Sequence, residues 1–244
     1  MAQQGSSGAA AFNLQKRTLT LKPAAAELRV ALFSGSALRS PGLDVVAYLR
    51  RTQADVFIVL GGLGRSHALA QQTASMLSSL QRLVLVVRGG ADGFHRAFPA
   101  ADNVLDASGV RSVRIGQDHL VLWPGAEQGR YALSPNACGF DEADLKLAED
   151  ELGAAEPGER RWLLAWQAPE PGSPLSDFKV RVGAIGGLFA WPPANEVADA
   201  AQITGSTQLV PRAWGPRMEA PDGHPLPRGA LVLRFDRDGP HSAR

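Results

Sequence analysis

The sequence predicts an α/β fold in which two facing sheets of mixed parallel and antiparallel strands are flanked by helices. Three observations predict it. Short apolar runs alternate with segments of helical periodicity over residues 27–88, which is typical of a parallel sheet. Two later apolar runs, joined by a short glycine turn, predict a hairpin and therefore antiparallel pairing. The chain has 244 residues, 45% of them hydrophobic, which is enough to bury one sizeable core.

The first half of the chain supplies the predicted parallel strands. Runs rich in Val, Ile and Leu are typical of strands in a sheet that is covered on both faces. Ser40 and Pro41 predict the N-cap and first turn of a helix that continues through Leu49, and Ser66 predicts the N-cap of a second helix. The predicted strands occupy residues 27–33, 54–60 and 82–88.

The second half mixes strand directions. Gly116 lies in the turn between the two arms of the predicted hairpin, 110–116 and 119–125. Asp141 predicts the N-cap of an acidic amphipathic helix. Further strands are predicted at 161–166, 182–190, 206–210 and 230–236, with a short helix at 194–202.

Both ends of the chain have the composition of tails. The first twelve residues are small and polar, and the last nine are polar and charged. The sequence therefore predicts a flexible N-terminal tail and lead-in over 1–26, one domain over 27–236, and a C-terminal tail over 237–244.

Charge and cysteine content exclude several classes of function. Lys and Arg total 25 against 24 Asp and Glu, so the chain lacks the basic excess that nucleic-acid binding requires. No run approaches the roughly 20 apolar residues that a membrane-spanning helix needs. Cys138 is the one cysteine, which excludes an intramolecular disulfide and favours the cytoplasm. We expect protein partners, because the low net charge suits a subunit of a complex.

The loops that follow the predicted strands are where a functional site is expected. In open α/β sheets, ligands bind beyond the carboxyl ends of the strands. Here those positions carry mainly serine, glycine and alanine instead of the usual catalytic side chains. The loops concerned are 34–37, 61–64, 89–93 and 166–169.

The strand-end blocks RVALFSGSA, ADVFIVLGG, VLVVRGGAD and WLLAWQAP resemble those of the calcineurin-like metallophosphoesterases. That family has Asp-x-His, Gly-Asp and Gly-Asn-His-Asp after its first three strands, and a His after a later one. The resemblance extends over residues 27–236 and implies the two-sheet sandwich of the family. In this chain the metal ligands are replaced, and of the matching residues only Asp92 remains. The corresponding positions are Gly35, Ala37, Gly62, Gly90, Ala91, Asp92 and Trp166.

The resemblance implies a catalytically inactive member of the family. A two-metal hydrolase needs carboxylate and imidazole ligands to lower the pKa of a bridging water, and glycine and alanine supply none. We therefore expect no metal, no cofactor and no catalytic residues. A retromer subunit and the small subunits of replicative DNA polymerases look like the same fold used as scaffolds, which favours a protein-binding role. Trp191 and Trp214, with loops 192–200 and 211–229, are the candidate partner contacts.

Three other hypotheses remain open. The chain could be an active phosphoesterase with an atypical metal site, which a bound divalent ion would reveal. It could be a sensor that binds a nucleotide or another small molecule in the vacated site, through Arg65, Arg88, Asp92 and His95. It could also be an unrelated doubly wound domain, which would lack a second sheet.

Overall fold

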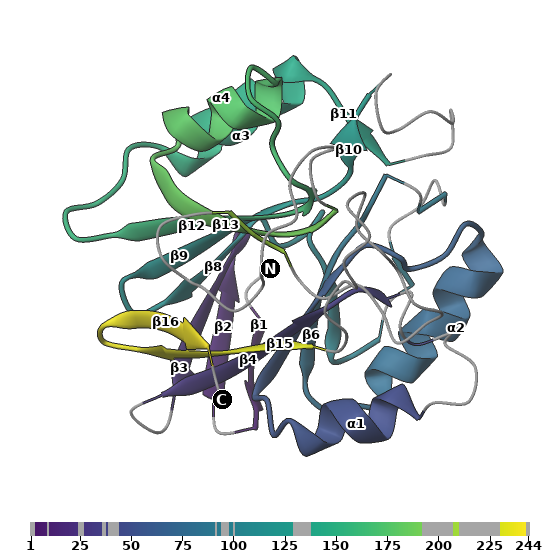
Figure 1. The fold of residues 1–244 in the computed structure, drawn as a ribbon. Helices are drawn as coiled ribbons and strands as arrows, with labels where there is room; N and C mark the ends of the chain where they lie inside the picture. Colours follow the sequence, from purple (N-terminus) through teal and green to yellow (C-terminus); the bar gives the residue numbers. More distant parts are fainter. Residues whose placement is uncertain are drawn as a thin grey trace, which may run out of the picture.

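The computed structural model describes eleven stretches of the chain: 3–8, 10–23, 27–35, 38, 44–90, 92–93, 98–99, 101–128, 138–191, 207–209 and 230–242. Its architecture is a sandwich of two mixed sheets with one helix pair on each outer side (Figure 1). Helices α1 and α2 cover one sheet, and α3 and α4 cover the other. The predicted two-sheet fold is confirmed.

One sheet has six strands in the order β16-β15-β4-β5-β6-β7. Its centre is the predicted parallel unit, and the antiparallel β15 pairs with β4 from Leu28 to Leu32. The strands are β4 (Leu28–Phe33), β5 (Val56–Leu60), β6 (Leu83–Val87), β7 (Val104–Asp106), β15 (Leu231–Asp236) and β16 (Gly239–Ser242).

The other sheet has eight strands in the order β1-β2-β3-β8-β9-β12-β13-β14. The hairpin predicted around Gly116 is β8 and β9, while β9, β12, β13 and β14 run parallel. The strands are β1 (Gln3–Ser7), β2 (Ala10–Gln15), β3 (Thr18–Pro23), β8 (Ser112–Ile115), β9 (Asp118–Trp123), β12 (Arg160–Gln167), β13 (Ala184–Trp191) and β14 (Thr207–Leu209), and a separate parallel pair is β10 (Ala126–Glu127) with β11 (Gly139–Phe140).

The helices begin at capped residues. Ser66 and Asp141 are N-caps as predicted, and Asp141 forms a reciprocal capping box with Asp144. The first helix has Asp44 as its N-cap, and the side chain of Asp44 accepts a hydrogen bond from Ala47 N. The predicted cap residues Ser40 and Pro41 lie outside the described residues. The helices are α1 (Val45–Arg51), α2 (His67–Ser78), α3 (Glu142–Leu152) and α4 (Pro174–Arg181).

The buried side chains form three layers. Val30 and Leu32 of β4 point between the sheets, whereas Ala31 and Phe33 of the same strand pack under α1 and α2. The same alternation explains why β5 and β6 are apolar at every position: both of their faces are covered. A third layer lies between the eight-stranded sheet and the pair α3 and α4.

The predicted tails over 1–26 and 237–244 are wrong as far as these residues are described. Strands β1, β2 and β3 form a meander that completes the eight-stranded sheet, and β16 pairs with β15. Leu19 and Leu21 lie in the core between the sheets. Strands β1 and β16 are edge strands that pair through backbone groups, so their mostly small or polar side chains give little sequence signal.

The helix predicted at 194–202 lies outside the described residues. Among the residues that are described, no helix is long and apolar enough to cross a membrane.

Candidate functional site

The loops at the carboxyl ends of the strands contact one another directly. Gly35 N donates to Gly61 O at 2.8 Å, and Gly61 N donates to Val87 O at 2.7 Å. Gly125 N, just beyond β9, donates to Arg88 O at 2.8 Å. Backbone groups from both sheets therefore close this end of the sandwich.

The indole of Trp166 lies between two of these loops. A Cβ atom built on Gly61 would lie 2.1 Å from Trp166 Cδ1, and one built on Gly89 would lie 2.7 Å from the same atom. No real side chain fits at either position without displacing the ring. Trp166 also packs on the core between the sheets. Glycine at both loops thus allows the indole to lie flush against their backbone.

Gly35 and Gly62 meet backbone to backbone. A Cβ atom on Gly35 would lie 2.9 Å from Gly62 O and 3.0 Å from Gly61 O. A carboxylate at position 35 would require the whole loop to move. The glycine here permits close approach of two main chains, which is a common reason for glycine at a strand end.

Asp92 is buried, with 1% of its surface exposed, and its carboxylate is bound by backbone N–H groups. Oδ1 accepts from Leu63 N at 2.7 Å and from Gly64 N at 3.1 Å. Oδ2 accepts from Gly89 N at 2.7 Å. The side chain therefore holds the loop after β5 against the loop after β6.

Arg88 forms an ion pair with Asp106. Its Nη2 lies 2.6 Å from Asp106 Oδ2 and its Nε lies 3.1 Å from the same atom. Asp106 also accepts from Phe98 N at 2.8 Å and from Ser108 N at 2.9 Å. Arg88 thus fastens the end of β6 to β7 at the sheet edge.

The remaining predicted site residues are distributed as follows. Gly90 is buried beside Gly89, and Arg65 is exposed on the loop before α2. The backbone of Trp191 ends β13. Four predicted positions lie outside the described residues: Ala37, Ala91, His95 and Trp214. The partner-contact loops 192–200 and 211–229 lie outside them as well.

Cys138 lies close to this end of the molecule. Burial raises the pKa of its thiol to about 11. The group is therefore protonated at neutral pH and is a poor nucleophile.

The side chains at this end do not fit a two-metal centre. The Asp92 oxygens are taken by three N–H donors, and an indole, which supplies no metal ligand, lies between the glycine loops. In the described ranges, no three His, Cys, Asp or Glu side chains are grouped so that they could hold a metal ion.

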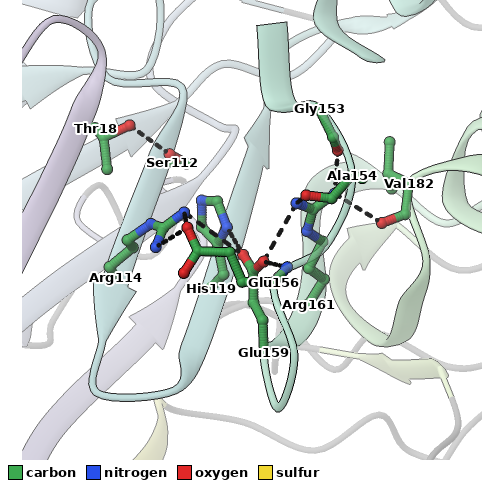
Figure 2. Close-up of polar contacts among 10 residues, drawn as sticks. All are labelled: Thr18, Ser112, Arg114, His119, Gly153, Ala154, Glu156, Glu159, Arg161 and Val182. Atoms are coloured by element: carbon green, nitrogen blue, oxygen red, sulfur yellow. Dashed lines mark hydrogen bonds and ion pairs between the residues drawn. The ribbon is translucent and has the colours of Figure 1, made fainter. Parts of the chain in front are cut away.

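A buried polar network that the sequence did not predict lies at the start of β9 and β12 (Figure 2). His119 Nδ1 makes a short contact with Glu159 Oε1. Glu159 Oε2 accepts from Glu156 N at 2.7 Å and from Arg161 Nη2 at 3.3 Å. Arg161 also donates to Gly153 O at 2.8 Å and to Val182 O at 3.2 Å. The charged run GERRW, whose last three residues begin β12, was the available sequence signal.

The network fixes the charges of its members. Burial favours a raised pKa for Glu159, but hydrogen bonds from Glu156 N, Arg161 and His119 outweigh it and lower the pKa to about 2. Burial lowers the pKa of His119 in spite of the neighbouring Glu159 carboxylate. At neutral pH an ionised Glu159 therefore accepts from a neutral His119. The network ties β9, β12, the loop after α3 and the end of α4 together.

Comparison with known proteins supports the fold alone. One solved structure superposes with a TM-score of 0.54 over 89% of this chain and 98% of that chain, at 10% sequence identity. No family model matches the sequence, and neither does any curated protein. The resemblance to metallophosphoesterases therefore stays a prediction.

Proposed function

We propose that this chain is a catalytically inactive metallophosphoesterase-like protein that acts as a protein-binding subunit of a complex. The observation that carries the proposal is the position of the Trp166 indole against Gly61 and Gly89. These loops are where the family would place its metal ligands. An aromatic ring there stabilises the fold through packing and supplies no activated water.

Asp92 supports the same proposal. Its counterpart in the family orients a catalytic histidine, a role that needs one carboxylate oxygen directed at an imidazole. Here both oxygens accept from backbone N–H groups. The residue has a structural task that is sufficient to explain its presence.

Exposed apolar side chains favour protein binding. Val180 of α4 is 75% exposed, Leu147 of the neighbouring α3 is 61% exposed, and Ile185 at the start of β13 is 48% exposed. The two helices are linked by an ion pair between Arg181 Nε and Glu149 Oε2 at 2.7 Å. Large apolar groups on a surface often mark contacts with other proteins.

Calorimetric titration of metal-stripped protein with Mn²⁺ tests the inactive assignment. We expect no binding tighter than about 100 μM, or roughly −5.5 kcal/mol. The same protein with Mn²⁺ added should not hydrolyse a chromogenic phosphodiester above the buffer rate. Tight binding together with hydrolysis that Trp166→Ala alters would establish the active phosphoesterase instead.

Affinity capture followed by reconstitution tests the partner role. A protein captured by the wild-type chain is purified and mixed with it, and the complex is weighed by light scattering. We expect Leu147→Lys/Val180→Lys to abolish the complex and Gln71→Lys/Gln72→Lys on exposed positions of α2 to leave it intact. Failure to form a complex from purified components, or equal loss with both double variants, would count against this surface.

A further inference from the structure

A pocket of about 480 Å³ lies at the end of the six-stranded sheet that is opposite to the Trp166 site. It is formed where the chain leaves α1 for β5 and leaves α2 for β6, so it sits at the amino ends of these strands. The Trp166 site follows their carboxyl ends. The size is within the range of small-molecule sites, about 300–1,000 Å³.

Two arginines line the pocket from different elements. Arg50, in the last turn of α1, donates from Nη2 to Ser79 O at the end of α2. Arg82, just before β6, donates from Nη1 to Gln81 O at 3.1 Å. Both side chains are exposed, and neither forms an ion pair with a carboxylate in the described part of the chain. A guanidinium has five N–H donors, so each arginine retains donors for a ligand.

The rest of the lining combines an apolar floor with polar walls. Phe57 and Leu80 are buried and form part of the floor. Gln53 and Gln81 lie in the turns after α1 and α2, with φ of 54° and 55°. Glycine adopts a positive φ at a lower energetic cost than glutamine does. Glutamine instead places an amide at each wall, which adds hydrogen-bonding groups beside the arginines.

The charge at the pocket is positive by one unit. The two guanidiniums face one carboxylate, that of Asp55, whose Oδ2 accepts from Arg29 N at 3.0 Å. Gly8 closes the rim, and a Cβ atom there would lie 2.5 Å from Asp55 Oδ1 and 3.3 Å from Arg82 Nε. A side chain at position 8 would therefore clash with Asp55.

We infer that this pocket binds a small molecule through a carboxylate or phosphate group. The oxyanion accepts hydrogen bonds from Arg50 and Arg82, and the uncharged part of the ligand rests on Phe57 and Leu80. The two parallel N–H donors of a guanidinium can bind two oxygens of a carboxylate or of a phosphate at once. The inference is independent of the proposed partner role. The proposed ligand site does not include Arg88, whose guanidinium forms an ion pair with Asp106.

Amide chemical-shift titration of the full chain tests the inference. The probes are inorganic phosphate in one arm and malonate in the other, at ionic strength held constant with sodium chloride. We expect saturable shifts at the backbone amides of Gln53 and Gln81 with at least one probe. The arm that saturates identifies whether phosphate or carboxylate is preferred.

Two variants make the result specific. Arg82→Gln removes a lining guanidinium whose only intramolecular bond in the described residues is to the neighbouring carbonyl. Arg51→Gln removes an exposed arginine that adjoins Arg50 but does not line the pocket. We expect Arg82→Gln to weaken binding about tenfold or more and Arg51→Gln to change it less than about twofold. Equal weakening by both variants, or no saturable shift with either probe, would overturn the proposal.

Discussion

The side chain of Trp166 restricts which residue can occupy position 61. The indole occupies the space that a methyl group on Gly61 would need, with 2.1 Å between that group and Trp166 Cδ1. Gly61 also has a φ of 62°, which disfavours any other residue. Two separate costs therefore attach to a side chain at position 61.

A double-mutant cycle separates these costs. We expect Gly61→Ala to lower the free energy of unfolding by about 2–4 kcal/mol in the wild-type chain. In a Trp166→Ala background the clash is gone, and the same substitution should cost only the backbone term of about 1–2 kcal/mol. Urea unfolding followed by circular dichroism measures all four proteins. Additive effects would mean that the ring does not occupy this space.

Asp92 gives a second prediction for a single residue. Asp92→Asn keeps the shape but replaces one acceptor oxygen by an amide donor, which faces a backbone N–H in either orientation. We expect a loss of about 2–3 kcal/mol in unfolding free energy, since a buried donor is left unpaired. Asp102→Asn, at an exposed position, is the matched control and should change stability by less than about 0.5 kcal/mol.

At the scale of elements, the network around His119 and Glu159 joins two strands to two helix ends. Folding lowers the pKa of Glu159 from 4.5 to about 2, so the folded chain holds this proton less tightly than the unfolded chain. The resulting stabilisation is complete above pH 4.5 and is lost as pH falls toward 2. The lowered pKa of His119 acts in the same direction, beginning below its ordinary value of 6.5.

Stability should therefore decline in two stages on acidification. The free energy of unfolding is measured by urea denaturation at a series of pH values between 7.5 and about 3. We expect His119→Gln to flatten the stage that begins below pH 6.5, and Glu159→Gln to flatten the stage below pH 4.5. Glu156→Gln, whose side chain is 68% exposed, should retain both stages. Identical pH profiles for all four proteins would contradict this account.

For the whole molecule, the N-terminal meander is part of the sandwich. Leu19 and Leu21 of β3 are 0% and 2% exposed and pack between the sheets. Ser7 Oγ, at the end of β1, accepts from Leu83 N of the other sheet at 2.6 Å. The first strands thus connect both sheets.

Truncation of one of these leucines tests the meander. We expect Leu19→Ala to cost about 2–5 kcal/mol, the usual range for a buried leucine. Lys22→Ala, on the exposed side of the same strand, should cost less than about 0.5 kcal/mol. A flexible tail would make the two substitutions equivalent in an unfolding experiment.

The sequence alone determined the features that depend on neighbouring residues. Strands β5 and β6 are apolar throughout because both of their faces are covered, and that composition is visible in the sequence alone. Ser66 and Asp141 cap helices through bonds that span three residues. The loops at the strand ends were identified for the same reason, since a glycine pair after an apolar run ends a strand.

Only the tertiary structure decided the features that depend on distant residues. The meander of β1, β2 and β3 joins its sheet through backbone bonds, which side-chain composition does not encode. The contact of Trp166 with Gly61 joins segments about a hundred residues apart, and the Asp92 bonds to the loop after β5 span 28 and 29 residues. The pairing of His119 with Glu159 and the pocket between Arg50 and Arg82 arise in the same way. Local pattern fixes which residues form an element, but packing fixes which side chains meet.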